Sequence, residues 1–265
     1  MSTLRAQLRI IPAAARIGLA EYRAHYTVRS WLGGWALRLT FQVVFFTSVG
    51  LVVGNADTVR YLAVGNVVAV MTMESVGAMA FVAGERRGGK LPLLMAAPGS
   101  HLVALAARSL NAPVGGLLSS TVVFLVVAPV FDIPLPGART LLLIPLVLIC
   151  ALTTYCYGLL FSALVMRFPT LAWPALNVSY LTIMAFAGVN VPVSYWPRPV
   201  ATLADGLPVT HGLAAVRALL SGGDWAGIVG AAGAELLVGV GWLAVAGLAM
   251  HLLLENARRT GGLDR

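Results

Sequence analysis

Six long apolar stretches, separated by short polar segments, dominate the chain. They cover residues 31–53, 61–83, 102–130, 140–166, 171–193 and 226–254. A helix that crosses a bilayer needs about 20 mostly apolar residues, and each stretch reaches that length. The longest segment between them, 194–225, is too short to form a separate folded domain. The pattern predicts an all-α, polytopic membrane protein in which residues 1–265 form one transmembrane domain of six helices.

The composition agrees with this prediction and helps to decide between nucleic acid and membrane lipid as the partner of the basic residues. The 265 residues are 59% hydrophobic and 11% charged, whereas soluble domains carry about 25% charged residues. The net charge of +8 could indicate nucleic-acid binding. However, the basic residues lie beside the apolar stretches, where they suit anionic lipid headgroups. We therefore expect membrane lipid, and no nucleic acid, among the partners.

The basic residues divide unequally between the two sets of polar segments. One set has four: Arg60, Arg139, Arg198 and Arg217. The other set has twelve: Arg5, Arg9, Arg16, Arg23, Arg29, Arg86, Arg87, Lys90, Arg167, Arg258, Arg259 and Arg265. Because cytoplasmic loops carry the excess of Lys and Arg, both termini and the loop after the second stretch are predicted to be cytoplasmic. The protein is then expected in the cytoplasmic membrane.

Residues 1–30 show a helical pattern before the first span. Arg5, Arg9, Arg16 and Arg23 share one face at about 100° per residue. An adjacent apolar stripe is formed by Leu4, Leu8, Ile11, Ala15, Leu19 and Tyr22. This pattern favours a helix lying in the membrane interface, with a kink or restart at Pro12. The alternative is a frayed basic tail.

The segment 84–100 resembles a phosphate-binding loop, because Gly84, Gly89 and Lys90 have the required spacing. Leu91 replaces the hydroxyl residue that binds magnesium, and a membrane span rather than a strand precedes the loop. The segment is better interpreted as a short cytoplasmic helix after a span that ends at Gly84. Its charged face contains Glu85, Arg86, Arg87 and Lys90, and its apolar face contains Leu91, Leu93, Leu94 and Met95, followed by Pro98. Such a helix suits docking to another protein.

Two stretches resemble type 2 ABC exporter permeases. "AGERRGGKLPLLMAAP" is similar to their "ERE-x-G-T-x-x-x-L-L-x-x-P" stretch at Glu85, Arg86, Gly88 or Gly89, Leu93 or Leu94, and Pro98, whereas Arg87 and Pro92 depart from it. The resemblance implies a coupling helix that docks into an ATPase subunit. The second stretch, 189–225, resembles a re-entrant helical hairpin at the outer face, with matches at Pro192, Pro197, Pro208, Thr210, His211 and Arg217. "YRAHYTVRSWLGGW" also resembles the family's interfacial helix and first-span entry.

The resemblance implies a transport subunit without catalytic residues, metal or cofactor of its own. ATP and Mg would be bound by an ABC ATPase partner in two copies, and the chain would form a homodimer. We expect a hydrophobic or amphipathic cargo, as in the antibiotic-exporting, daunorubicin-type branch. The expected lining of the cargo path is Phe41, Phe45, Phe46, Tyr155, Tyr157 and Asn177. The alternatives are a polysaccharide or teichoic-acid exporter, an integral-membrane lipid-modifying enzyme and a structural scaffold.

Four ionisable residues fall inside the apolar stretches, where charge is costly. Arg38, Glu74 and Arg108 are predicted at similar heights in the cytoplasmic half of the bilayer. They could form a buried ion cluster, or be two snorkelling arginines and a lone protonated Glu74. Glu235, near the middle of the last span, is either protonated and alone or paired with Arg217 or His211.

Overall fold

The structure, a computed structural model, describes residues 2–25, 27–88 and 101–260, and this part of the chain contains helices and no strand. The α-helices are α1 (Ser2–His25), α2 (Val28–Ser30), α3 (Leu37–Val53), α4 (Ala56–Val76), α5 (Ala78–Arg87), α7 (His101–Arg108), α8 (Asn111–Val130), α9 (Leu143–Arg167), α10 (Ala172–Phe186), α11 (Arg198–Asp205), α12 (Thr210–Leu220) and α13 (Trp225–Thr260). A π-helix, η1 (Trp31–Ala36), joins α2 to α3, and three short 3-10 helices are η2 (Gly137–Leu142), η3 (Pro169–Leu171) and η4 (Val193–Tyr195). The prediction of an all-α fold is confirmed.

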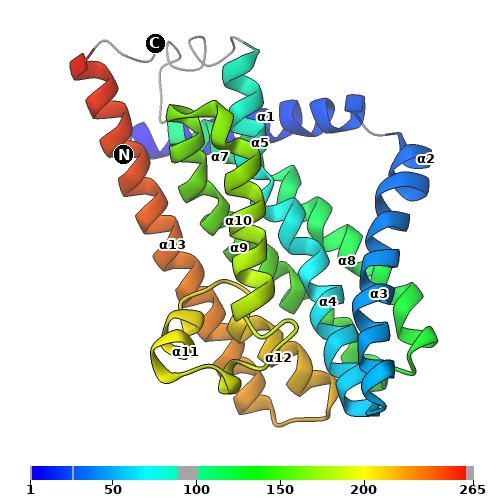
Figure 1. The fold of residues 1–265 in the computed structure, drawn as a ribbon. Coiled ribbons are helices and arrows are strands. Elements are labelled where there is room, and N and C mark those ends of the chain that lie inside the picture. The colour runs from blue at the N-terminus through cyan, green and yellow to red at the C-terminus, as the bar shows by residue number, and fades with distance from the viewer. Residues whose placement is uncertain (1, 26, 89–100, 261–265) are drawn as a thin grey trace.

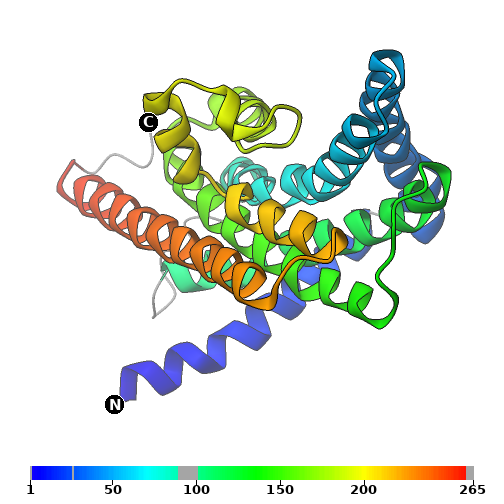
Figure 2. The same ribbon diagram turned by 90° about the horizontal axis from the view of Figure 1, so that it is seen from below.

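The long helices run side by side, with α3 and α13 at opposite edges and α4 and α9 between them (Figures 1 and 2). The start of α1 and the end of α13 lie at one end of the molecule, which we call the terminal end. Helices α11 and α12 lie at the other end, which we call the hairpin end. Helix α1 crosses the terminal end of the bundle instead of running along it (Figure 1).

Within the part of the chain that the structure describes, five helical segments are long and apolar enough to cross a membrane. They are Val28–Val53, Ala56–Phe81, Ala106–Val130, Gly137–Arg167 and Trp225–Leu253. The predicted span over 171–193 is not among them, because α10 has only 15 residues. At about 1.5 Å per residue it extends about 22 Å, less than the roughly 30 Å of a hydrocarbon core. Six full spans are therefore not confirmed, although α10 runs alongside α9 from the terminal end towards the hairpin end (Figure 1).

Local sequence signals explain where the second long helix begins, but not where it breaks. Helix α3 ends at Gly54, which adopts a left-handed φ of 74°. Asn55 then caps α4 by accepting a hydrogen bond from the Asp57 backbone N–H at 2.8 Å. The break after α4 falls at Gly77, and α5 continues through Gly84 to Arg87. The prediction that Gly84 ends the helix is therefore wrong, because glycine is tolerated inside a helix when its hydrogen bonds are kept.

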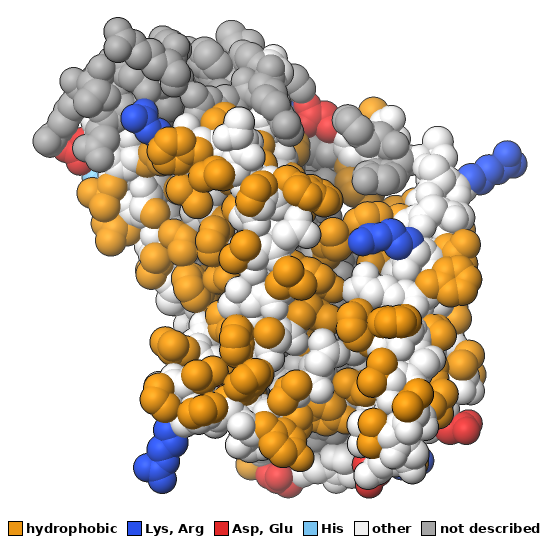
Figure 3. All heavy atoms as spheres, viewed as in Figure 1, with side chains coloured by type: hydrophobic (Ala, Val, Ile, Leu, Met, Phe, Trp, Pro, Cys, Tyr) orange, Lys and Arg blue, Asp and Glu red, His pale blue; other side chains and the backbone are white. Residues whose placement is uncertain are grey.

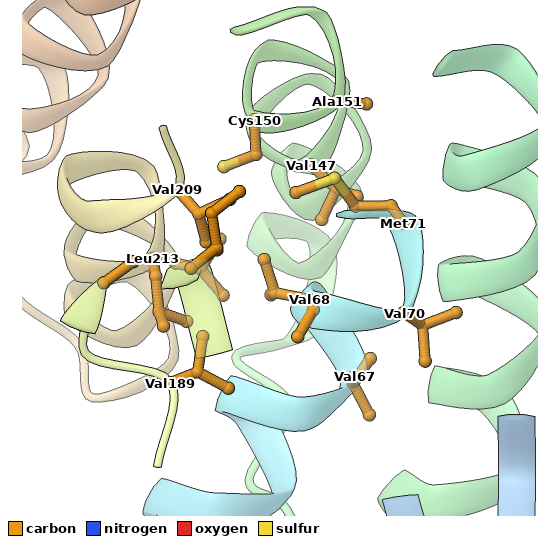
Figure 4. Packing of buried hydrophobic residues seen from close by; sticks show 14 of the residues in the cluster. Val67, Val68, Val70, Met71, Val147, Cys150, Ala151, Val189, Val209 and Leu213 are labelled. Atoms are coloured by element: carbon orange, nitrogen blue, oxygen red, sulfur yellow. The ribbon is translucent and has the colours of Figure 1, made fainter. Parts of the chain in front are cut away.

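Helix α4 forms the centre of the hydrophobic core. Every residue from Leu62 to Met71 is buried, so this helix has no lipid-facing side over that length. Figure 4 shows Val67, Val68 and Met71 of α4 packed among side chains of α9, α12 and the segment that contains Val189. A break or shift in α4 therefore changes the packing of the helices that contact it.

The outer helices expose many large apolar side chains (Figure 3). On α3 these include Phe41 and Phe45, which are 64% and 66% exposed, and on α10 Trp173 is 67% exposed. Such surfaces are unfavourable in water and suit contact with lipid or with another membrane subunit.

Helix α1 is continuous from Ser2 to His25 and passes through Pro12, so the predicted restart at that residue is wrong. A helix rather than a frayed tail therefore precedes the first span. Its buried positions, Ala14 and Gly18, face the bundle, whereas Ile17 and Leu19 are exposed. This distribution leaves apolar side chains available to a membrane surface.

Candidate functional site

An open cavity of about 530 Å³ lies where the first three long helices are interrupted. The π-helix η1 contributes Trp35, the break between α4 and α5 contributes Gly77, and the turn between α7 and α8 contributes Ser109. The remaining described residues of the wall are Arg38, Met73, Glu74, Ala78, Ala80, Phe81, Asn111, Ala112, Trp173 and Leu176. Irregular backbone inside a membrane protein is tolerated where it lines a cavity, and interrupted helices commonly form transporter binding sites. We call this space the Glu74 cavity.

Glu74 is held by two uncharged donors. Trp35 donates its indole N–H to Glu74 Oε1 at 2.5 Å, and the Ser119 hydroxyl donates to the same oxygen. A Cβ atom at Gly115 would crowd Oε2, so glycine at this position leaves space for the carboxylate beside α8. Because π-turns are frequent at functional sites, the delivery of the Trp35 indole by η1 marks this position as a candidate.

The predicted ion cluster of Arg38, Glu74 and Arg108 is absent. Within the described part of the chain, no ion pair joins Glu74 to either arginine. The Arg38 guanidinium lies over the Trp35 ring, 5.2 Å from its centroid, and its Nη1 is 3.9 Å from the sulfur of Met73. The rise per residue predicts similar heights in the bilayer for the three residues. The direction in which each side chain leaves its helix, however, depends on packing.

Arg108 instead connects α7 to α1. Its Nη2 donates to both carboxylate oxygens of Glu21, at 3.0 and 3.1 Å, and its guanidinium lies 5.6 Å from the Phe81 ring centroid. Gly18 makes the close approach possible, because a Cβ atom there would collide with the backbone carbonyl of Arg108. Helix α1 is thus fixed to the helix that follows the 89–100 segment. The sequence does not predict the pairing of Glu21 with Arg108, because Glu21 lies outside the apolar stretches in which a buried ion pair is expected.

The turn after Arg108 is fixed from the other side by α9. The Tyr155 hydroxyl donates to the Ala106 carbonyl at 2.6 Å and lies 2.9 Å from the Ser109 hydroxyl. Tyr155 and Tyr157 are buried, with 4% and 5% exposure. They pack within the single chain and do not line an open path, contrary to expectation. Phe41 and Phe45 are exposed, while Phe46 and Asn177 are half-buried.

At the hairpin end, Glu235 binds the N-terminus of α12. Its Oε1 accepts the backbone N–H of Val209 at 2.7 Å, and its Oε2 accepts that of Gly212 at 2.9 Å. Glu235 is fully buried, and a negative group is stabilised at a helix N-terminus. The predicted pairing with the side chain of Arg217 or His211 is not observed. His211 Nε2 lies 3.0 Å from the Asp205 carbonyl, and Thr210 donates to the Ala204 carbonyl at 2.7 Å.

Arg217 holds the segment that follows α10. It donates to the carbonyls of Gly188, Tyr61 and Val189 at 2.9, 3.1 and 3.3 Å, and its guanidinium lies 3.5 Å from the centroid of the Tyr61 ring. Tyr61 also donates to the Gly188 carbonyl at 2.6 Å. Burial lowers the pKa of Arg217 to about 10, so its guanidinium stays charged at neutral pH.

A second contact supports the same segment. Asn66 of α4 donates to the Asn190 side-chain oxygen at 2.9 Å. Pro192 lies at the end of the segment, before η4, and Pro208 is buried before α12. The predicted hairpin residues therefore lie at one end of the molecule, where they join α4, α10, α12 and α13.

The predicted docking residues are described only in part. Glu85, Arg86 and Arg87 lie on the last turn of α5. Lys90, Leu93, Leu94 and Pro98 lie outside the described residues. Within the part that is described, no group of three His, Cys, Asp or Glu side chains could hold a metal ion.

The comparison with protein families identifies the class to which this architecture belongs. The family model described as ABC-2 type transporter matches residues 23–220. The chain belongs to the ABC-2 type transporter membrane family. It is therefore the multi-pass permease subunit of an ABC transporter, not a catalytic enzyme, and the family implies an ABC ATPase partner. No curated protein matches the chain.

The matched range begins near the end of α1 and stops at the last residue of α12. It therefore includes the Glu74 cavity, Arg108 and Arg217 but not Glu21 or Glu235. The predicted family is confirmed, whereas the daunorubicin-type branch is not shown.

Proposed function

We propose that the ABC-2 permease exports a hydrophobic or amphipathic compound across the cytoplasmic membrane, as a homodimer with two ATPase subunits. ATP and Mg would be bound by those subunits and not by this chain. The observation that carries the proposal is the family match over 23–220. The concentration of basic residues in the polar segments near α1, α5 and the end of α13 supports a cytoplasmic terminal end.

The mostly apolar lining of the Glu74 cavity supports a lipophilic cargo. Trp35, Phe81, Trp173 and Leu176 supply apolar surface, whereas Glu74 and Arg38 are the charged side chains among its described lining residues. A cavity of this kind suits a molecule with a large apolar body and few polar groups. The cavity is lined at the junctions of α4 with α5 and of α7 with α8, and α5 and α7 lie near the terminal end (Figure 1). A cargo that enters from the inner leaflet would reach it there. A compound of the antibiotic-export type has these properties.

Two further assignments complete the proposed transporter. Residues 84–100 serve as the coupling helix, in which Glu85, Arg86, Arg87, Lys90, Leu93, Leu94 and Pro98 dock to the ATPase. Helix α10 and residues 187–192 complete a sixth crossing, with α11 and α12 forming a re-entrant hairpin at the outer face. The contact between α1 and α7 is consistent with force passing from the coupling helix to the interfacial helix.

Co-purification tests the docking assignment. The tagged permease, co-expressed with an ABC ATPase, is expected to retain it, and the variant Glu85→Ala/Arg86→Ala is expected to lose it. Arg167→Ala removes a charge from the same end of the bundle and serves as the matched control. Equal retention of the ATPase by both variants contradicts docking through this segment.

A transport assay tests the direction. Inside-out vesicles that contain both subunits are expected to accumulate a lipophilic compound when ATP is supplied. Accumulation that does not depend on ATP contradicts an ATP-driven exporter.

A further inference from the structure

We propose that the Glu74 cavity recognises a protonated amine on a lipophilic cargo, with Glu74 as the residue that binds the amine. This inference rests on the proposed export function and assigns both a binding site and a chemical class of cargo. Three features of the cavity support it: the interrupted backbone, the position of the Glu74 carboxylate and the aromatic side chains in the wall.

The carboxylate of Glu74 has acceptor capacity that the protein does not use. Both Trp35 and Ser119 donate to Oε1, and within the described residues no donor reaches Oε2. An ionised carboxylate offers about four acceptor positions on its two oxygens. A protonated amine carries up to three donors and the opposite charge, so it can use positions that a neutral molecule leaves unfilled.

The charges around the cavity also favour a cation. Glu74 has no ion-pair partner within the described part of the chain, although a carboxylate inside a membrane protein is costly unless it is compensated. Arg38 is stacked on Trp35, and Arg108 binds Glu21. The two arginines that could neutralise Glu74 are therefore directed elsewhere. A cationic cargo supplies the missing charge at the depth of the cavity.

The walls provide the apolar part of the recognition. Trp35, Phe81 and Trp173 line the same space, and aromatic faces attract both apolar bodies and cations. A second cavity, of about 230 Å³, lies between α4, α8 and α9. Its described lining residues are apolar apart from Ser120, Thr121 and Thr140, and none of them is charged. A neutral lipophile could occupy either cavity, whereas an amine gains an additional interaction only beside Glu74.

The decisive experiment compares two fluorescent probes of the same shape, 9-(aminomethyl)anthracene and 9-anthracenemethanol. The full chain is placed in phosphatidylcholine nanodiscs, and energy transfer from tryptophan to anthracene reports binding; empty nanodiscs correct for partition into lipid. The amine is expected to bind about tenfold more tightly than the alcohol, as for a hydrogen bond to a charged group. Equal affinities overturn the proposal.

Two variants assign the preference to Glu74. Glu74→Gln preserves the size of the side chain and is expected to bring the affinity ratio of the two probes close to one. Arg38→Gln removes the nearby positive charge from an exposed position and is expected to tighten amine binding several-fold, the opposite direction. Persistence of the amine preference in Glu74→Gln, or unchanged or weaker amine binding in Arg38→Gln, overturns the proposal. The second variant keeps the test valid if the first does not fold.

The two proposals fail in different ways. The probe assay uses the permease alone, whereas retention of the ATPase depends on the 84–100 segment. A wild-type protein that retains the ATPase but does not prefer the amine contradicts only the amine site. A protein that prefers the amine but retains no ATPase contradicts the proposed docking.

Discussion

Glu74 and Glu235 are carboxylates inside apolar helices, and each is held by uncharged donors. Glu74 receives an indole N–H and a hydroxyl, whereas Glu235 receives two backbone N–H groups at the start of α12. Burial of a polar group is tolerated when its hydrogen bonds are made. The two sites differ in their unused acceptors: both Glu235 oxygens accept hydrogen bonds, whereas among the described residues Glu74 has donors to Oε1 alone. Glu235 therefore fits a structural role, and Glu74 fits a binding role.

Replacement of Glu235 by leucine should destabilise the hairpin end. The change leaves the backbone N–H groups of Val209 and Gly212 without their acceptor, and a buried unsatisfied donor costs about 1–3 kcal/mol. We expect Glu235→Leu to lower the melting temperature of the purified protein by several degrees, measured by size-exclusion chromatography after heating. Asp57→Asn, which changes a carboxylate that is 91% exposed, is the control and should leave the melting temperature nearly unchanged.

Gly65 should tolerate no larger residue. A Cβ atom at this position of α4 would collide with the Val189 carbonyl and lie 2.8 Å from Arg217 Nη2. We expect Gly65→Ala to separate α4 from the segment after α10 and to lower the melting temperature. At Gly230 of α13 an added Cβ meets no atom within 4 Å. Gly230→Ala should therefore be neutral or stabilising, since alanine favours helix by about 1 kcal/mol; equal losses in the two variants would contradict the steric explanation.

Among the helical elements, each of the first three long helices is interrupted near the terminal end. Helix α3 begins through a π-helix, α4 and α5 meet at Gly77, and α7 and α8 meet at Ser109. Because the interruptions converge on one cavity, a movement of α5 or α7 changes the shape of the Glu74 cavity directly. The contact between α1 and α7 adds the interfacial helix to this unit.

Reversal of the Arg108–Glu21 pair tests the connection between α1 and α7. We expect Glu21→Arg and Arg108→Glu each to destabilise the protein, and the double variant to recover part of the loss. The coupling between partly buried charges in contact is roughly 0.5–3 kcal/mol. Thermal stability and hydrogen exchange of α1 are the measurements. Arg23→Glu, an exposed reversal on the same helix, is the control; additive losses in the double variant would show that the pair does not couple the helices.

At the scale of the whole molecule, α10 determines the topology. If α10 and the segment after it span the membrane, the segments on either side of them lie on opposite faces of the bilayer, and the chain crosses the membrane six times. Arg217, Tyr61 and Asn66 fix the non-helical segment after α10, and thereby replace hydrogen bonds that a longer helix would make internally. A short helix followed by such a segment can complete a crossing within the protein.

Cysteine labelling tests this topology. Thr170 precedes α10 and Ser221 follows α12, and both residues are exposed. In intact cells a membrane-impermeant maleimide is expected to label Ser221→Cys but not Thr170→Cys, and to label both after permeabilisation. The native Cys150 and Cys156 are buried and half-buried, and the unmodified protein measures their background. Labelling of both introduced cysteines before permeabilisation contradicts the proposed sixth crossing.

The membrane class, the helical fold, five of the spans and the family follow from the amino-acid sequence alone. These properties depend on long apolar runs and local motifs, which are readable without knowledge of packing. The partners of the buried charges are visible only in the folded chain, because a side chain's direction around its helix depends on neighbours distant in the chain. The folded chain likewise shows that α10 is short, that the break lies at Gly77 and that Glu21 is the partner of Arg108. The apolar runs continue through those positions, and the donors and close contacts that alter the helices come from other elements.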